Sequence, residues 1–280
     1  MAELENIREY YLKQYESINR YLSSCLNEIN EDQIHRLRLA IKKLQAFNLL
    51  GESIGFLDHR KHIRNERKIK KLFNLVGQIR DYQVQKIMLQ TIQKKTGSDF
   101  NEFNEWLIRH EQKKVDKFHS KQRRIYKKST FSAQPENIIL PNVTFQDDQV
   151  DMCAKKIIDS LILSIREQMK ILPDTFALHR IRMITKRLRY VINIMHHVYP
   201  DFNHGIITET ELRTIENIAG EWHDKLLRVE MLERFLKKRT KEGAPAEEKY
   251  LRFLALCSGE NEVAFTKTCA RVRKVYRKIN

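Results

Sequence analysis

Apolar residues recur at helical spacing along most of the chain, which places them on one face of each segment. This pattern predicts eight helices, at residues 4–29, 31–50, 60–95, 98–128, 147–171, 174–198, 203–239 and 245–278. With only 8 Gly and 5 Pro in 280 residues, the composition is also typical of long helices. We therefore expect an all-α protein.

Capping residues mark several of these boundaries. Asn30 precedes the second segment and has Gln33 three residues later, and Asp174 stands at the start of the sixth segment, directly after Pro173. Ser98 stands before the acidic turn that begins the fourth segment. Gly97 and Pro200 follow two of the predicted helices, where each residue is expected to end helical structure.

The composition limits the class of protein. Apolar residues make up 41% of the chain, enough to bury a sizeable core. The four cysteines lie far apart, and no stretch approaches the roughly 20 apolar residues of a membrane span. We expect Cys25, Cys153, Cys257 and Cys269 to be reduced and mostly buried thiols. For the protein as a whole we expect no metal site, no cofactor and a cytoplasmic location.

The charge of the chain favours an anionic partner. Lys and Arg number 52 against 36 Asp and Glu, which gives a formal net charge of +16 and a sequence pI near 9.6. Self-repulsion on this scale weakens the compact state unless an anion accompanies it. Composition alone leaves nucleic acid, an anionic membrane and a polymeric phosphate open.

The chain divides into two halves that repeat one another. Residues 130–146 contain two prolines and no helical stripe, which predicts a linker between residues 1–129 and residues 147–280. His-x-x-Arg-x-x-x-Lys occurs in each half at an offset of 144, first as His35, Arg38 and Lys42 and then as His179, Arg182 and Lys186. The block Gly77-Gln-Ile-Arg80-Asp81 matches Gly220-Glu-Trp-His223-Asp224 at an offset of 143.

A third, weaker match joins the final helices of the halves at an offset of 150. These last-helix rows are Lys117, Lys121, Arg124 and Lys128 in the first half and Lys267, Arg271, Lys274 and Lys278 in the second. Three blocks in one order indicate an internal duplication. We therefore predict two tandem four-helix bundles, each formed by one half.

The basic residues of the first block lie beside the predicted core. At ~100° per residue, the first basic stripe (His35, Arg38, Lys42) shares one helix face, and so does the second basic stripe (His179, Arg182, Lys186, Arg189). The apolar face is centred about 110° to 130° away, so each stripe flanks the buried face. Each stripe runs ~10 to 15 Å along its helix, which suits an extended anion. A basic run on a helix is usually a solvated face, but its duplication here favours binding.

These residues resemble the CHAD family, the conserved histidine α-helical domains. The first family signature is matched by His35, Arg38, Lys42 and Lys43, and again by His179, Arg182, Lys186, Arg187, Arg189 and Tyr190. The second signature is matched by the block around Gly77 and, more loosely, by the block around Gly220. The resemblance covers nearly the whole chain and implies two four-helix bundles around a basic cavity or channel, with inorganic polyphosphate bound by the matching residues. Gln45 replaces a frequent basic residue, so we expect the second copy, which has Arg189, to contribute more affinity.

Other candidates have structural interpretations. His223-Asp224 is similar to the metal-binding pair of phosphohydrolases, but its duplicate is Arg80-Asp81, and an arginine cannot ligate a metal. We expect both aspartates to accept hydrogen bonds from the facing Arg or His and thereby orient the stripes. Gly77 and Gly220, at one duplicated position, indicate close helix approach, and a backbone path beside the ligand is the alternative. The remaining expectations are helix-end or surface positions for His59, His62, His196 and His197, and core positions for Trp106 and Trp222.

The most favoured function is non-catalytic binding of inorganic polyphosphate. RNA or DNA binding through the same surface is the alternative, although aromatic residues are not interleaved with the stripes. A metal-dependent phosphohydrolase rests only on the duplicated His and Asp residues. A place on polyphosphate granules and regulation of a partner are both open, as are chain-length preference, oligomeric state and whether the last-helix rows are solvated or contact the anion.

Overall fold

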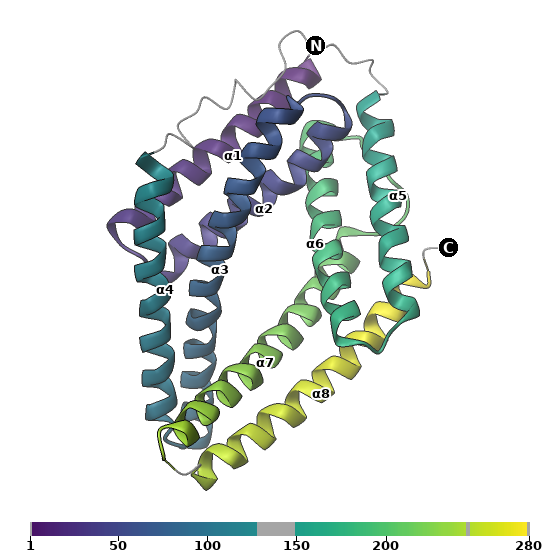
Figure 1. Cartoon of the computed structure of the whole chain (residues 1–280). Coiled ribbons are helices and arrows are strands. Elements are labelled where there is room, and N and C mark those ends of the chain that lie inside the picture. The colour runs from purple at the N-terminus through teal and green to yellow at the C-terminus, as the bar shows by residue number, and fades with distance from the viewer. Residues whose placement is uncertain (1, 128–148, 245–246, 279–280) are drawn as a thin grey trace. The chain divides into compact units, whose positions relative to one another are not determined.

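The computed structural model describes residues 2–127, 149–244 and 247–278 (Figure 1). Within these ranges the chain is all-α and has no strand, which confirms the predicted fold class. The helices are α1 (Ala2–Asn27), α2 (Glu31–Ser53), α3 (His59–Thr96), α4 (Asn101–Lys127), α5 (Gln149–Lys170), α6 (Thr175–Val198), α7 (Glu209–Lys241) and α8 (Glu248–Tyr276). The predicted linker, residues 130–146, lies outside the described residues.

Two of the predicted caps and both predicted stops are confirmed, with Gly97 after the end of α3 and Pro200 after the end of α6. The side chain of Asn30 accepts the backbone N–H of Gln33 at 2.9 Å, and Asp174 accepts that of Ala177 at 2.7 Å. Each bond satisfies a donor that the first turn of a helix leaves unpaired. Gly97 follows α3 directly with a φ of 65°, a left-handed conformation that glycine adopts at little cost.

Three predicted helix starts are wrong, and local hydrogen bonds explain two of them. α8 begins at Glu248, three residues later than predicted. α4 begins at Asn101 and not at Ser98, because the side chain of Asp99 accepts the Asn101 N–H at 2.9 Å. α7 begins six residues later than predicted, at a capping box in which Thr208 and Glu211 each accept the other's backbone N–H at 3.2 Å. In both cases a short-range hydrogen bond, and not apolar periodicity, sets the first turn.

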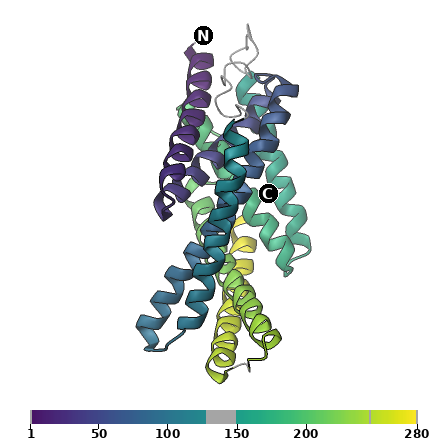
Figure 2. The ribbon, with the colours of Figure 1, turned by 60° about the vertical axis from the view of Figure 1, so that its left-hand side comes forward.

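The helices form two compact units. Unit 1 contains residues 1–77, 115–165 and 184–207, and unit 2 contains residues 78–114, 166–183 and 208–280. In Figures 1 and 2, α1 and α2 pack side by side within unit 1, as do α7 and α8 within unit 2. Both units therefore take helices from both halves of the sequence. The tandem bundles and the cavity between them stay predictions.

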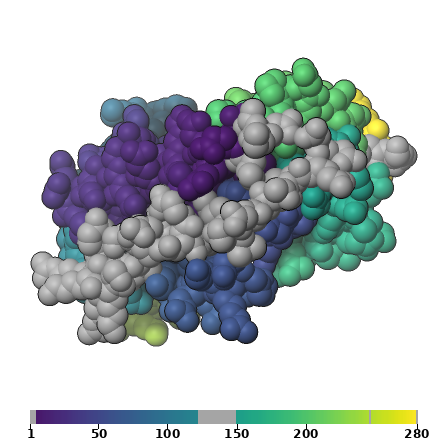
Figure 3. Space-filling model, turned by 90° about the horizontal axis from the view of Figure 1, so that it is seen from above, coloured from purple at the N-terminus to yellow at the C-terminus, as the bar shows by residue number. Residues whose placement is uncertain are grey.

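An aromatic cluster stabilises unit 1. The ring centroids of Tyr11 and Phe47 lie 5.1 Å apart, and those of Phe47 and Phe56 lie 6.0 Å apart. The Tyr11 hydroxyl donates to Tyr15 at 3.3 Å, and burial raises the pKa of Tyr11 to about 12. These contacts fix α1 on α2 through one face of α1. Part of α1 forms the purple surface of Figure 3.

The core of unit 2 combines helices from the two halves of the sequence. Phe100, directly before α4, stacks on Phe253 of α8 with ring centroids 4.2 Å apart, and Phe103 of α4 lies 5.3 Å from Phe235 of α7. The buried cluster consists of Tyr82, Leu89, Phe100, Phe103, Trp106, Leu107, Met231, Leu232, Phe235, Leu236, Tyr250, Phe253 and Cys257. Burial of this apolar surface is the main force that holds the four helix segments together.

Several predictions about individual side chains are confirmed. Trp106 and Trp222 are buried, with 4% and 1% of their surface exposed. All four cysteines are free thiols, and three of them, Cys25, Cys257 and Cys269, are buried. Among the described helices, none combines the length and the apolar character that a membrane crossing requires.

Candidate functional site

The predicted site residues are distributed over both units. Unit 1 holds His35, Arg38, Lys42, Lys43, Lys117, Lys121, Lys186, Arg187, Arg189 and Tyr190. Unit 2 holds Arg80, Asp81, His179, Arg182, His223, Asp224, Lys267, Arg271, Lys274 and Lys278. The side chain of Arg124 and the whole of Lys128 lie outside the described residues. The first basic stripe and the end of the second therefore belong to one compact unit.

The first basic stripe lies beside the core of unit 1. Leu37 and Ile41 of α2 are fully buried, whereas Arg38 and Lys42 are half-buried and His35 is exposed. A half-buried cation keeps its aliphatic stem on apolar surface and its charged end near solvent. This burial agrees with the helical-wheel prediction that the stripe flanks the buried face.

The second basic stripe has the same relation to the buried face of α6. Ile181 and Leu188 of this helix are fully buried. The stripe residues between and around them are all half-buried, namely His179, Arg182, Lys186 and Arg189. Arg187, the residue after Lys186, is exposed. Tyr190 is buried, and the centroid of its ring lies 4.7 Å from the guanidinium carbon of Arg189.

The guanidinium group of Arg38 lies on the neighbouring helix α3. Its Cζ is 4.7 Å from the centroid of the Phe73 ring, which is a cation–π geometry. Its Nη1 reaches Gly77, one turn further along α3, where a Cβ would clash with it. Because glycine has no Cβ, the guanidinium group can lie directly against the backbone. The predicted close approach at Gly77 is therefore made by an arginine side chain.

The equivalent glycine of the second half has a different environment. None of the described residues lies within 4 Å of a Cβ built on Gly220, so the predicted close approach is wrong at this position. At the same offset of 143 residues, Glu216 occupies the position of Phe73. The second copy therefore has a carboxylate where the first has an aromatic ring.

Arg182, the counterpart of Arg38, lies in an acidic environment. Burial lowers the pKa of its guanidinium group, and the negative charges of Asp224, Glu216 and Asp81 oppose that shift by stabilising the cation. Its Nε atom is buried and has no hydrogen-bond partner among the described residues. Asp81 and Asp224, which occupy the same position in the two copies of the duplicated glycine block, thus both act on Arg182. Their role in orienting the stripes stays a prediction.

Two imidazoles meet near this arginine in unit 2. The rings of His179 and His223 have centroids 5.0 Å apart. At His179 the second basic stripe therefore lies beside residues 220–224 of α7. The side-chain amide of Gln85 donates to the backbone oxygen of Asp224 at 2.8 Å and ties α3 to α7. The second basic stripe on α6 and helix α7 therefore meet at these two rings.

The last-helix rows are more open to solvent than the stripes. Among their described members only Arg271 is half-buried, and the exposed ones are Lys117, Lys121, Lys267, Lys274 and Lys278. The first row lies in unit 1 and the second in unit 2. Both interpretations from the sequence, a solvated face and an anion path, stay open for these residues.

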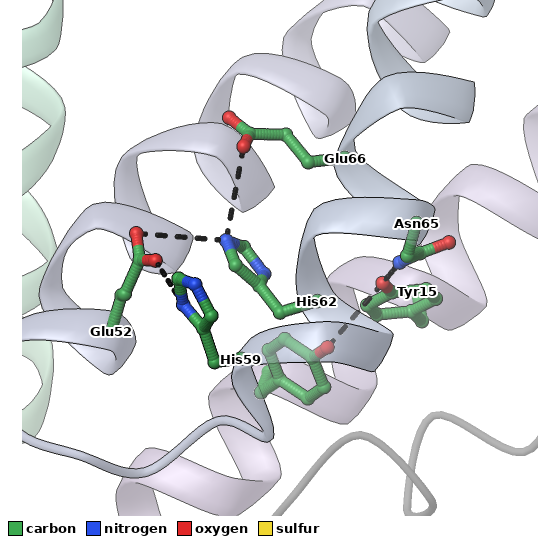
Figure 4. A network of polar contacts seen from close by, with 7 residues as sticks. Tyr15, Glu52, His59, His62, Asn65 and Glu66 are labelled. Atoms are coloured by element: carbon green, nitrogen blue, oxygen red, sulfur yellow. Dashed lines mark hydrogen bonds and ion pairs between the residues drawn. The ribbon is translucent and has the colours of Figure 1, made fainter.

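A histidine and glutamate cluster lies at the junction of α2 and α3 (Figure 4). His59 Nδ1 is 3.1 Å from a carboxylate oxygen of Glu52, and His62 Nε2 is 3.9 Å and 3.8 Å from the carboxylates of Glu52 and Glu66. Both histidines lie in the first turn of α3, as the helix-end interpretation predicts, and His59 is also exposed. His62 is only 2% exposed, so it is not a surface residue. Among the described residues, no group of three or more His, Cys, Asp and Glu side chains could hold a metal ion.

Comparison with known proteins gives a consistent result. The family model of the CHAD domain matches residues 9–233. The crystal structure of the CHAD domain from the plant Ricinus communis is similar over 99% of this chain and 92% of its own, with a TM-score of 0.68 and 14% identity. PptA from Streptomyces chartreusis is similar over 98% of each chain, with a TM-score of 0.66 and 12% identity. At these identities the two structures show a shared fold. No curated protein matches the chain in sequence.

Proposed function

The chain belongs to the CHAD domain family, and from this premise we propose that it binds inorganic polyphosphate through its two basic stripes. The family is linked to polyphosphate binding in general. The observation that carries the proposal is the duplicated row His-x-x-Arg-x-x-x-Lys, whose Arg and Lys residues are half-buried beside the core in both copies. We further propose that binding is not followed by cleavage of the phosphate chain.

The half-buried position of the stripes suits phosphate recognition. A cation beside apolar surface is screened less by water than an exposed cation, so its attraction to a phosphate oxygen is stronger. Arg38 has a fixed direction because Phe73 and Gly77 hold its guanidinium group, which can then donate two parallel hydrogen bonds. Lys42 adds a mobile point charge one turn further along α2.

The proposal is tested with a stripe variant in which four cations of unit 1 are neutralised. The changes are Arg38→Gln, Lys42→Gln, Lys186→Gln and Arg189→Gln. Arg182 is kept, because its removal would leave the charges of Asp81, Glu216 and Asp224 uncompensated. Each phosphate contact contributes roughly 0.7 to the slope of log K against log salt concentration. If each of the four cations contacts one phosphate, the slope of the stripe variant is therefore smaller in magnitude by about 2.8. Titration calorimetry with polyphosphate at several salt concentrations measures this slope.

A charge-matched control separates the stripes from net charge. The control variant carries Lys155→Gln, Arg213→Gln, Arg234→Gln and Arg252→Gln, four exposed residues that pair with acids on their own helices. We expect the wild-type protein and the control variant to be stabilised by about 2.7 kcal/mol when free polyphosphate is at 100 times Kd. An equal affinity of the stripe variant and the control variant would refute the proposal.

Two competing functions give different results in the same experiments. If RNA displaced polyphosphate at equal phosphate concentration, nucleic-acid binding would replace the proposal. If the protein released orthophosphate from polyphosphate with Mg²⁺ or Mn²⁺, it would be an enzyme. We expect neither result.

A further inference from the structure

The beginning of α3 carries a dense basic surface that the duplicated stripes do not include. Residues 59–71 hold seven basic residues and one acidic residue, a surplus of six charges out of the formal +16. Four of them fall within a sector about 60° wide and span ~16 Å of helix. These are Arg60, Arg64, Arg67 and Lys71, here called the outer row. All four are exposed, and the beginning of α3 contributes to the blue surface in Figure 3.

The outer row lies on a different face of α3 from the contact with the first basic stripe. Arg38 meets α3 at Phe73 and Gly77, which are centred roughly 130° round the helix from the outer row. The row also has no basic counterpart in the second half. At the offset of 143 its four positions correspond to Asn203, Ile207, Thr210 and Thr214. It is therefore separate from the duplicated site.

Several exposed cations on other helices of this chain are paired with acids, and the outer row is not. Five basic residues on other helices form salt bridges with an acid four positions earlier, namely Arg36, Lys155, Arg213, Arg234 and Arg252. None of the four outer-row side chains forms a salt bridge within the described residues. The outer row therefore lacks the paired acids that accompany these five cations.

The acids nearest to the outer row have other partners. Asp58 accepts the backbone N–H of Lys61 at 2.9 Å, and this bond, with smaller effects of the Lys61 and Arg60 charges, lowers the pKa of Asp58. Glu66 faces His62 at 3.8 Å. Like charges four residues apart destabilise a helix. The outer row therefore costs stability that a bound polyanion would restore.

The chemistry of the segment indicates which polyanion fits. None of the large apolar side chains exposed on the described surface lies in α3 before Ile87. The outer row therefore lacks the aromatic platforms that stack nucleic-acid bases and the apolar side chains that enter a membrane surface. A linear polyphosphate offers charge alone. We propose that the outer row is a second binding surface for polyphosphate, which takes up the part of a long chain that extends beyond the basic stripes. This inference rests on the proposed function.

The test compares two ligands of different length. An outer-row variant carries Arg60→Gln, Arg64→Gln, Arg67→Gln and Lys71→Gln. The control variant defined above also replaces three arginines and one lysine, so both variants lose four positive charges. Tripolyphosphate is too short to contact both surfaces at once. We expect the outer-row variant to bind tripolyphosphate as the wild-type protein does and to bind long-chain polyphosphate more weakly.

The expected size of the effect follows from the four lost contacts. At roughly 0.7 per contact, the salt slope for long-chain polyphosphate falls by about 2.8 in magnitude. Between 50 and 200 mM salt, the affinity advantage of the wild-type protein over the outer-row variant should therefore shrink by about 50-fold. Titration calorimetry at both salt concentrations measures it.

Each other outcome overturns one of the two proposals. Equal long-chain affinity and salt slope of the outer-row and control variants would show that the row is only a solvated face. An equal loss for tripolyphosphate would place the row in the first site, and a loss confined to RNA or to anionic vesicles would assign it another partner. If the wild-type protein bound neither phosphate chain, the proposed function itself would fail, which is a distinct result.

Discussion

Replacing Gly77 by Ala separates the position of Arg38 from the stability of the fold. Alanine in a helix interior is favoured over glycine by about 0.5–1 kcal/mol. The new Cβ occupies the place of Arg38 Nη1, so the guanidinium group must leave Phe73 and lose a cation–π contact worth about 0.5–2 kcal/mol. The free energy of unfolding should therefore change by between a gain of about 0.5 and a loss of about 1.5 kcal/mol.

The affinity for polyphosphate should change much more than the stability. Displacement of Arg38 removes one charge-assisted hydrogen bond to phosphate, which contributes about 1.5–3 kcal/mol. The Kd of Gly77→Ala should rise about 10- to 150-fold. Urea unfolding gives the free energy of unfolding, and titration calorimetry with long-chain polyphosphate gives Kd.

Gly220→Ala is the matched control, because it changes the equivalent residue of the second half. Its Cβ meets none of the described residues within 4 Å, so the variant should gain about 0.5–1 kcal/mol and keep its Kd. In an Arg38→Ala background, Gly77→Ala should have no further effect on Kd. The reasoning is refuted if the two alanine variants bind equally well, or if the loss at Gly77 persists without Arg38.

Two further predictions concern unit 2. Burial lowers the pKa of His110, so the folded state favours the neutral ring. The stability that this contributes is present above the pKa of the unfolded state, near 6.5, and is lost as pH falls through the pKa of the folded state. Between about pH 7 and about pH 5, His110→Phe should therefore lose less stability in urea unfolding than the wild-type protein, and equal losses would contradict this. Glu260→Ala removes the carboxylate 3.3 Å from the buried Arg228 and should cost about 1–3 kcal/mol in the same assay. Glu230→Ala, whose arginine partner is exposed, should cost less than about 1 kcal/mol; similar losses for both would exclude a special role for burial.

The stripes could be found in the sequence because helical geometry relates spacing to direction. His35, Arg38 and Lys42 share a face in any α-helix, and the fully buried Leu37 and Ile41 confirm which side of that face is the core. The structural partner of Arg38 could not be found in this way. Phe73 is not repeated in the second half, and a duplicated glycine alone does not indicate which group approaches it.

The buried His62 shows a related limit. Its sequence neighbourhood is strongly basic and suggests a solvated surface, but the register of α3 turns this position inward together with Asn65 and Ile69. The acid that meets both histidines, Glu52, comes from the end of α2. A cluster made from two helices and the turn between them depends on how that turn folds, which periodicity does not specify.

Local interactions let the sequence alone determine the helices, most of their bounds, the duplication and the faces that carry charge. Helix formation depends on residues within a few positions of one another, and their types and spacings are visible in the sequence. Only the tertiary structure decided which helices share a core. Phe100 and Phe253 stack although they come from different halves of the sequence. Arg38 meets an aromatic ring, whereas its counterpart Arg182 lies among carboxylates. Apolar faces are not specific for one partner, so the choice among them depends on how side chains from distant segments fit together.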